Sequence, residues 1–403
     1  MTLVMTMMVR DEADVISAWL DHHLAQGVDM FVITDNASVD GTTEILEEYA
    51  SRGRIDLRHD PEHRKQQGTV VTRMARDAHT MHGADWVINA DADEFWMPRA
   101  AGRTLSDVFA EMPTAYRSFT VAVTDMIGAP ALEGSGLQRL TYRDLRPANA
   151  MKKLGLLDHA TPVAVHVGDP DVIVSQGNHL VSIESKGEPG DDLAIDVLHF
   201  PWRSWSQFSR KVEVSGRAYE SNPHLTPSAN HHGMRDYGRL KRGTLLPYYV
   251  MRHPAGDELA QGILDGYFVP DSRIADSRPS PVADVAIDPA LEKVARALGR
   301  ELHSVAAKVD RLEPELAAAT ARAAADEEAR RGQSATILEL AIERDNLVAE
   351  RDALRADRDA VASRLSEAER LLRERFTDRA LRVMRGRAIR ARSALRQRGR
   401  SGV

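Results

Sequence analysis

The first hundred residues alternate short apolar runs with amphipathic segments, and this alternation constrains the fold more than any other feature. Apolar runs at residues 3–9, 30–34 and 86–90 predict strands, and residues 54–58 are expected to form another. The segments between them place apolar side chains at helical spacing. Strands that alternate with helices form βαβ units, in which the strands are parallel. The chain is therefore expected to begin with a three-layer α/β domain.

The pattern changes after this region. Residues 105–200 show mostly alternating apolar and polar side chains with glycine and proline between the runs, which is typical of antiparallel strands and loops. Residues 202–219 again have helical spacing. The predicted sheet is therefore mixed, and the predicted α/β domain covers residues 1–280.

Composition excludes several classes of protein. The chain has 403 residues, of which 43% are hydrophobic, so it can bury a core without disulfides or structural metals. It contains no cysteine, which excludes thiolate metal sites and cysteine nucleophiles. The net charge of −7 argues against a nucleic-acid partner. No apolar run is long enough to span a bilayer and no cleavable leader is visible, so we expect a cytoplasmic protein.

The C-terminal part has a different composition. Residues 281–289 read as a linker, and residues 290–375 are rich in Ala, Arg, Glu and Leu. A 4-3 spaced apolar seam predicts a coiled coil and a homodimer formed through it; the alternative is an amphipathic helix that folds back on the domain. Pro314 is expected to kink or divide this helix. The seam comprises Leu298, Leu302, Val305, Val309, Leu312 and Leu316, and a weaker series continues at Leu340, Leu347, Leu354 and Val361.

The last segment, residues 376–403, is a basic tail. Eleven arginines lie between Arg373 and Arg400, against two acidic residues. On a helix, the tail has a narrow apolar stripe among these arginines, as expected for peripheral contact with an anionic inner membrane face. The alternatives are a frayed terminus or a segment that pairs with an acidic protein surface.

The sequence NADADEFW provides the clearest signal of chemistry. Asp91 and Asp93 follow a predicted buried strand, where open α/β sheets bind ligands. Carboxylate oxygens in this arrangement suit Mg²⁺ or Mn²⁺ held partly by phosphate. Asp-x-Asp also occurs at residues 169–171 and 357–359, but only the first copy ends a predicted parallel strand.

Two further segments are candidates for ligand contacts. In ITDNASVDGT, a strand delivers Asp35 to its carboxyl end, where the side chain could accept hydrogen bonds from a nucleobase or ribose. The alternative is an ordinary strand-to-helix turn. In QGTVVTRMARD, the guanidinium of Arg73 suits a phosphate or a carboxylate. Read alone, Arg73 is better explained as a solvated charge on a helix.

Taken together and in order, these motifs resemble the nucleotide-sugar-dependent glycosyltransferases of the family 2 type, which have the GT-A fold. The matching positions are Arg10-Asp11-Glu12, DNASVDGT, Gly68 with Arg73, and Asp91-Ala92-Asp93. The segments WLDHH, DADEF, QGNHLV and LHFPWRSWSQFSRKVEVSGRAY resemble the branch with the Asp-x-Asp-Glu-Phe metal motif, extending the resemblance to about residue 220.

The resemblance implies a function and a set of site residues. It implies transfer of a sugar, such as a hexose, from a nucleoside diphosphate sugar to a glycan or glycolipid acceptor, with inversion, as in polysaccharide biosynthesis. Asp35 would contact the nucleoside and Arg73 the nucleotide. Asp91 and Asp93 would bind the diphosphate through Mn²⁺ or Mg²⁺. His199 would be a third metal ligand, with His179 as its competitor.

The general base is not identified by the sequence, and other functions stay open. A metal-dependent phosphohydrolase or nucleotidyltransferase could use the same carboxylates. A coiled-coil interaction protein with a degenerate catalytic domain is a further alternative. The candidates for the base are Asp158, Glu184, Asp192 and Asp196.

Overall fold

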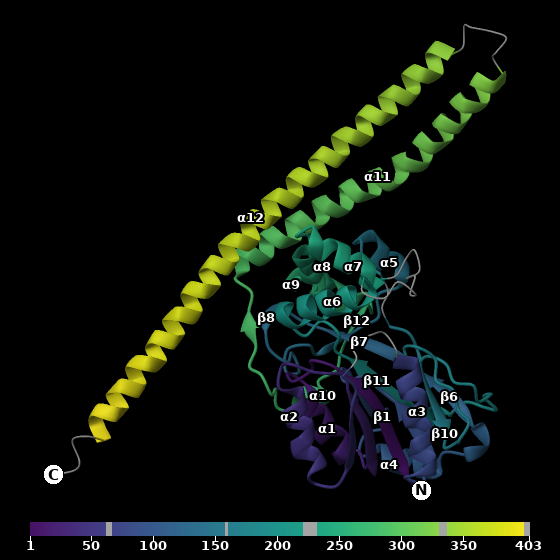
Figure 1. Cartoon of the computed structure of the whole chain (residues 1–403), viewed down its shortest axis with the longest axis vertical. Helices are drawn as coiled ribbons and strands as arrows, with labels where there is room; N and C mark the ends of the chain where they lie inside the picture. The colour runs from purple at the N-terminus through teal and green to yellow at the C-terminus, as the bar shows by residue number, and fades with distance from the viewer. Residues whose placement is uncertain (62–66, 158–159, 221–231, 330–336, 399–403) are drawn as a thin grey trace. The chain divides into compact units, whose positions relative to one another are not determined.

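The computed structural model describes residues 1–61, 67–157, 160–220, 232–329 and 337–398. The chain divides into two compact units (Figure 1). One comprises residues 1–240 and 248–288, and the other comprises residues 241–247 and 289–403. The strands all belong to the first unit, and the two long C-terminal helices belong to the second.

The strands are β1 (Leu3–Val9), β2 (Met30–Asp35), β3 (Ile55–His59), β4 (Trp86–Asn89), β5 (Glu94–Pro98), β6 (Ser118–Val121), β7 (Val123–Ile127), β8 (Ala131–Glu133), β9 (Tyr142–Asp144), β10 (Val163–Val167), β11 (Ile195–His199), β12 (Phe268–Pro270) and β13 (Val285–Ala286). The helices are α1 (Ile16–Ala25), α2 (Thr42–Ala50), α3 (Gln67–Thr80), α4 (Leu105–Glu111), α5 (Ala148–Lys153), α6 (Trp205–Glu220), α7 (His232–Lys241), α8 (Leu245–Arg252), α9 (Gly256–Leu264), α10 (Arg273–Ser277), α11 (Pro289–Ala329) and α12 (Ile337–Arg398).

The larger sheet has the mixed character expected from the sequence. Its strand order is β3-β2-β1-β4-β10-β6. The first four of these strands are parallel, and β10 is antiparallel to both β4 and β6. Because β1, β2 and β4 run in the same direction, their carboxyl ends meet at one edge of the sheet. The predicted α/β class with a mixed sheet is confirmed.

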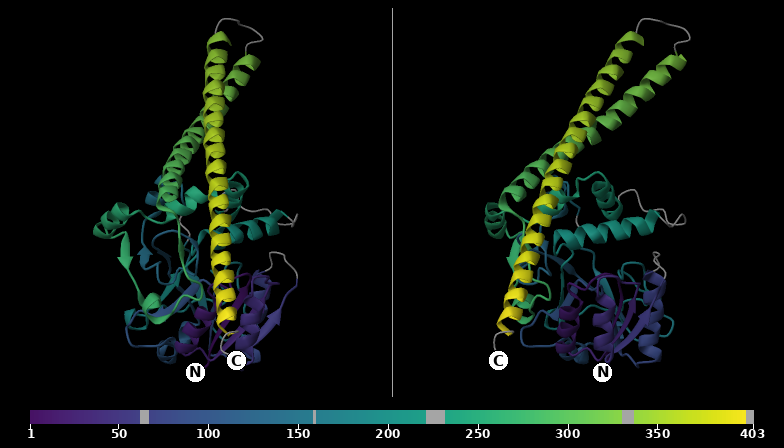
Figure 2. Two further views of the ribbon diagram at one scale, coloured as in Figure 1. Left: turned by 90° about the vertical axis from the view of Figure 1, so that its left-hand side faces the viewer. Right: turned by 60° about the vertical axis from the view of Figure 1, so that its left-hand side comes forward.

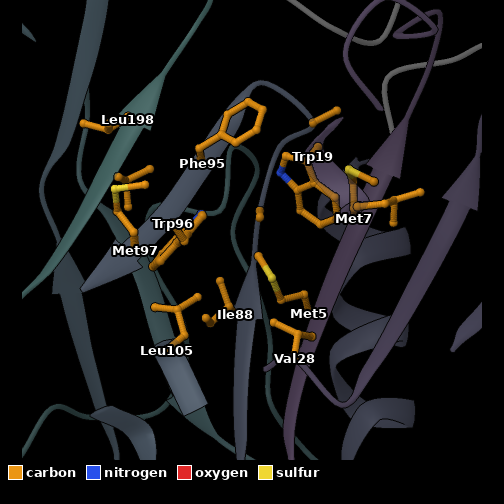
Figure 3. Packing of buried hydrophobic residues seen from close by; sticks show 14 of the residues in the cluster. Met5, Met7, Trp19, Val28, Ile88, Phe95, Trp96, Met97, Leu105 and Leu198 are labelled. Carbon is orange, nitrogen blue, oxygen red and sulfur yellow. The ribbon is translucent and has the colours of Figure 1, made fainter. Parts of the chain in front are cut away.

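Alternation along β1 creates the layers on the two faces of this sheet. Met5 and Met7 lie on the face covered by α1, where they share a buried cluster with Trp19 (Figure 3). Val4 points to the opposite face and packs with Met74 of α3. A parallel strand that is buried on both faces explains why this run is continuously apolar.

The second sheet has the order β12-β9-β7-β11-β5 and brings two distant segments together. β5 begins directly after Asp93 and pairs antiparallel with β11, so that His199 lies opposite Glu94. β11 is parallel to β7, where His199 lies opposite Asp125. This pairing places the end of β11 beside the Asp-x-Asp segment.

The Trp-Leu-x-His-His segment of α1 is bonded to the backbone of β5. The indole of Trp19 donates to the carbonyl of Glu94 at 2.8 Å. His22 Nε2 contacts the Trp96 carbonyl at 2.8 Å, and the Trp96 amide donates to His23 Nε2 at 3.1 Å. All three side chains are buried. Their role is therefore to hold β5, and with it the preceding acidic segment, in place.

Buried neutral histidines predict a loss of stability in acid. Burial lowers the pKa of His22 to about 4, against 6.5 for an exposed histidine, and lowers that of His23 as well. As pH falls below 6.5, the unfolded chain binds protons that the folded chain excludes, so the free energy of unfolding decreases until the folded pKa is reached. We expect a loss of about 2 kcal/mol from His22 alone between pH 7.5 and pH 5. Urea unfolding at these two pH values measures the loss of unfolding free energy.

The matched variant for this test is His22→Gln, because glutamine keeps a donor for the Trp96 carbonyl without titrating. It should show a shallower dependence of unfolding free energy on pH than the parent. A slope identical to that of the parent would contradict the assignment of this acid sensitivity to His22.

The C-terminal unit contains an antiparallel helical hairpin. α12 packs along α11 (Figure 2), and ion pairs join Glu301 to Arg364 at 2.8 Å and Glu313 to Arg355 at 3.1 Å. The seam residues from Leu298 to Leu312 are buried, as is Val361 on α12. The apolar seam predicted from the sequence thus has a partner helix in the same chain, and association of two chains through it stays a prediction.

Two details of this region differ from expectation. α11 continues through Pro314, so the expectation that the proline divides the helix is wrong, while a kink at this position stays a prediction. Pro314 is exposed, and the Asp310 carbonyl that loses its helical partner can be solvated instead. Within the predicted linker, Val285 and Ala286 form β13 and pair with β8. Among the described helices, none combines the length and apolarity needed to cross a bilayer.

Candidate active site

A cavity of about 250 Å³ lies where the strand-end loops meet α3 and α6. It contains both acidic and basic groups, which is typical of a site for a charged ligand. The polar residues that line it are Arg10, Asp11, Glu12, Asn36, Gln67, Asp91, Asp93, Gln176, Gln207, Arg210, Lys211 and Ser215.

The DNASVDGT segment joins the loops that follow β1 and β2. The Asp11 amide donates to Ser38 Oγ at 3.0 Å, and the Asp11 carboxylate accepts from the Val39 amide at 2.8 Å. The Glu12 amide donates to Thr42 Oγ1 at 2.9 Å. These bonds fix the loop that carries Glu12 into the cavity.

Asp35 belongs to the same turn. Its carboxylate accepts from Ser38 Oγ and from Thr43 Oγ1, both at 2.5 Å, and its side chain is buried. Asn36, the next residue, lines the cavity, whereas Asp35 is not among its lining residues. The described contacts of Asp35 are those of a turn organiser, and a nucleoside contact stays a prediction.

Arg73 lies on a second, open groove. Its side chain is 79% exposed, and its nearest ion pair is with Asp77 at 3.9 Å. The groove is formed by α3 and residues 173–176, and Gln176 lines both this groove and the first cavity. The structure therefore does not bring Arg73 together with Asp91 and Asp93, and its contact with a nucleotide stays a prediction.

Asp93 lies at the centre of the charged groups in the cavity. Its Oδ1 is 3.6 Å from His199 Nε2, and its Oδ2 is 2.7 Å from Lys211 Nζ. Burial opposes ionisation of the carboxyl, but Lys211 and His199 outweigh it and hold the pKa of Asp93 well below its usual range. Asp93 is thus a carboxylate with cationic groups on two sides.

His199 is held in place by a second carboxylate. Its Nδ1 is 2.7 Å from Asp125 Oδ1, which leaves Nε2 facing Asp93. Burial alone would lower the pKa of His199, but Asp93 and Asp125 raise it to about 10. Asp125 comes from β7 and was not predicted from the sequence.

Asp91 is positioned by the QGNH segment. Its Oδ1 accepts from Asn178 Nδ2 at 3.2 Å and from Gln67 Nε2 at 3.1 Å. Gly177 and Asn178 both have positive φ, a turn that presents the Asn178 amide to Asp91. Burial and the charge of Asp93 raise the pKa of Asp91. The neighbouring His179 bonds to the Pro162 carbonyl at 3.1 Å, so His199 is the histidine beside Asp93.

Arg203 and Lys211 connect the two acidic segments. The Arg203 guanidinium is fully buried, forms a bidentate pair with Asp14 at 2.8 and 3.0 Å, and donates to Glu12. Lys211 Nζ is 3.2 Å from Glu12 Oε1. Neither cation was predicted as a site residue, although both lie in the segment LHFPWRSWSQFSRKVEVSGRAY. The sequence did contain a signal that could have identified them. It places one basic residue after a predicted strand and a second one on the helix that follows.

Asp93 and His199 can share a divalent ion. The 3.6 Å between Asp93 Oδ1 and His199 Nε2 is compatible with one ion at about 2.1 Å from each atom. The Asp125–His199 pair is the usual support for a histidine ligand. Among the described residues, no three His, Asp or Glu side chains form a group that could hold a metal by themselves. Substrate phosphate or water would therefore have to complete the coordination.

Of the four predicted candidates for the general base, the three that the structure describes do not line the cavity. Asp158 lies outside the described residues. Asp196 is paired with Arg143 and Arg273. Glu184 pairs with Lys186 on the surface, and Asp192 is exposed. Among the described residues, Glu184, Asp192 and Asp196 are absent from the lining of the cavity.

The N-terminal part of the chain is similar to a known protein family. Residues 2–125 match the model of glycosyltransferase family 92. The matching segment runs from β1 through most of β7 and contains Glu12, Asp91, Asp93 and Asp125. This part of the chain is therefore similar to glycosyltransferases. The matched family is 92, whereas the motifs resemble family 2, so membership in the family 2 branch stays a prediction.

Solved structures with some similarity include those of S. aureus TarS. TarS itself is 12% identical with a TM-score of 0.29, and the alignment covers 63% of this chain and 49% of that one. TarS 1-349 in complex with UDP is 13% identical with a TM-score of 0.28, covering 62% and 71%. The complex with UDP-GlcNAc is 12% identical with a TM-score of 0.29, covering 63% and 82%. The chain thus spans about half the length of full TarS. No curated protein sequence matches.

Proposed function

We propose that this protein is a glycosyltransferase that transfers a sugar from a nucleoside diphosphate sugar to a hydroxyl group of a glycan or glycolipid, with inversion and with Mn²⁺ or Mg²⁺ bound at Asp93 and His199. The observation that carries the proposal is the grouping of His199 and Lys211 around Asp93, with Asp93 and Lys211 lining one cavity and Asp125 supporting the histidine. This grouping combines a pair of metal ligands with a cation suited to phosphate.

The residues of the cavity suit the charge changes of this reaction. As the bond between sugar and diphosphate breaks, negative charge grows on the leaving group, and preorganised cations stabilise it. The divalent ion, when bound, would supply part of that positive charge. Lys211 and Arg210 line the same cavity and would supply more. Asp91, fixed by Asn178 and Gln67, would orient the donor beside them.

The acceptor hydroxyl must lose a proton during inversion. A carboxylate or imidazole within hydrogen-bond reach of the acceptor hydroxyl is required.

Contact of the basic tail with an anionic membrane, which would suit a lipid-linked acceptor, also stays a prediction. α12 continues to Arg398, and the side chains beyond Leu371 lie outside what the structure describes.

The proposal predicts metal-dependent donor binding and release of an intact nucleoside diphosphate. Thermal shift with a panel of nucleoside diphosphate sugars and Mn²⁺ would identify the donor, and chromatography of the products would identify the leaving group. We expect stabilisation by at least one donor that is lost with EDTA. Release of phosphate or pyrophosphate would favour the phosphohydrolase or nucleotidyltransferase alternative. No nucleotide binding would favour an interaction protein.

A further inference from the structure

Lys211 differs from the other cation beside Asp93. The Arg203 guanidinium is fully buried and bonded to Glu12, Asp14 and the Phe200 carbonyl, so it has no freedom to change partners. The Lys211 side chain is 46% exposed and lines the cavity, although its ammonium reaches Glu12 and Asp93. An ammonium on a flexible, partly exposed side chain can exchange one anionic partner for another.

The two carboxylate oxygens of Asp93 face different partners, one on the side of the proposed metal ion and the other on the side of the Lys211 ammonium. Oδ1 faces His199 at 3.6 Å, and Oδ2 faces Lys211 at 2.7 Å. A divalent ion bound at Oδ1 would neutralise the charge that now attracts Lys211, and it would repel the ammonium. A diphosphate in the cavity would attract it. The combination favours movement of the ammonium from carboxylate to phosphate.

We infer that Lys211 is the diphosphate-binding residue of this site, and that its ammonium leaves Asp93 for the phosphate oxygens when a divalent ion and the donor bind together. The inference rests on the proposed function. It adds to that function a diphosphate-binding residue and a coupling between binding of the metal and binding of the donor. Before the donor binds, Lys211 neutralises Asp93 and Glu12; afterwards it neutralises the diphosphate. Arg210, which pairs with Asp40 at 3.3 Å, remains on the same helix as a second cation.

This exchange predicts two effects of opposite sign for Lys211→Met. Pyrophosphate, used as a probe that carries no base or sugar, should bind in the presence of Mn²⁺ about tenfold to hundredfold more weakly. Mn²⁺ alone should bind at least about threefold more tightly, because a competing positive charge has been removed. A lysine with a purely structural role would not increase metal affinity when it is lost.

Isothermal titration calorimetry on the full chain measures both affinities, and circular dichroism verifies folding. Arg217→Met is the matched control, because Arg217 lies on the same helix, is 69% exposed and pairs with Glu213 outside the cavity. It should leave both affinities unchanged. If Lys211→Met fails to fold, Lys211→Gln takes its place, since glutamine can still donate to the two carboxylates, and the same two shifts are expected.

The outcomes separate the inference from the proposed function. If the parent binds Mn²⁺ and pyrophosphate and the Lys211 variant binds pyrophosphate equally well, the inference is overturned and the proposed function is retained. Weaker Mn²⁺ binding by the variant would also overturn the inference. If the parent binds neither probe, both the inference and the proposed function fail.

Discussion

Asp93→Asn should reduce donor turnover by about a hundredfold to a thousandfold. Asparagine keeps the shape of the side chain but removes the negative charge that faces His199 and Lys211. The site would then lose affinity for a divalent ion and leave two cations without their shared partner. Steady-state rates with the preferred donor, at several Mn²⁺ concentrations, measure the effect.

Asp171→Asn is the matched control for this substitution, because Asp171 belongs to another Asp-x-Asp segment, is exposed and does not line the cavity. Its turnover should equal that of the parent. Folding of both variants is verified by circular dichroism, since Asp93 is buried among charges. A folded Asp93→Asn protein with parental turnover would remove Asp93 from the metal site.

Arg203→Met should lower the free energy of unfolding by about 3–5 kcal/mol, the usual result of removing one partner from a buried ion pair. Arg203 is fully buried and neutralises both Glu12 and Asp14, and its NH1 lies 3.8 Å from Asp93 Oδ2. Methionine fills much of the volume but leaves these carboxylates without their main counter-ion. Urea denaturation followed by tryptophan fluorescence measures the change.

The surface variant Arg217→Met should change the free energy of unfolding by less than about 0.5 kcal/mol, because its ion pair with Glu213 is exposed. A loss of less than about 1 kcal/mol for Arg203→Met would contradict the view that this guanidinium holds the two acidic segments together.

Local patterns in the sequence predicted much of the fold. The βαβ alternation identified β1 to β4, and burial on both faces explains why β1 and β4 are largely apolar. The position of Asp91 and Asp93 at a sheet edge followed from the same reasoning. The helical seam was also visible, but periodicity is the same whether the partner helix belongs to one chain or to another.

The charged partners in the site could not be predicted in the same way. Lys211 meets Asp93, and Asp125 meets His199, only because β7, β11 and α6 bring residues 125, 199 and 211 to the end of β4. No spacing in the sequence encodes these contacts, since each depends on strand pairing across dozens of residues. Arg73 illustrates the reverse case: its motif was in order, but its side chain lies on a separate groove.

The contacts between α1 and β5 have a consequence for solubility. β5 is the last strand in the order of its sheet, and an edge strand with free backbone groups can recruit a strand from another molecule. Here the amide and carbonyl of Trp96 are both bonded to histidine side chains, and the Glu94 carbonyl is bonded to Trp19. A helix therefore closes this edge with side chains, protecting an apolar strand from edge-to-edge aggregation.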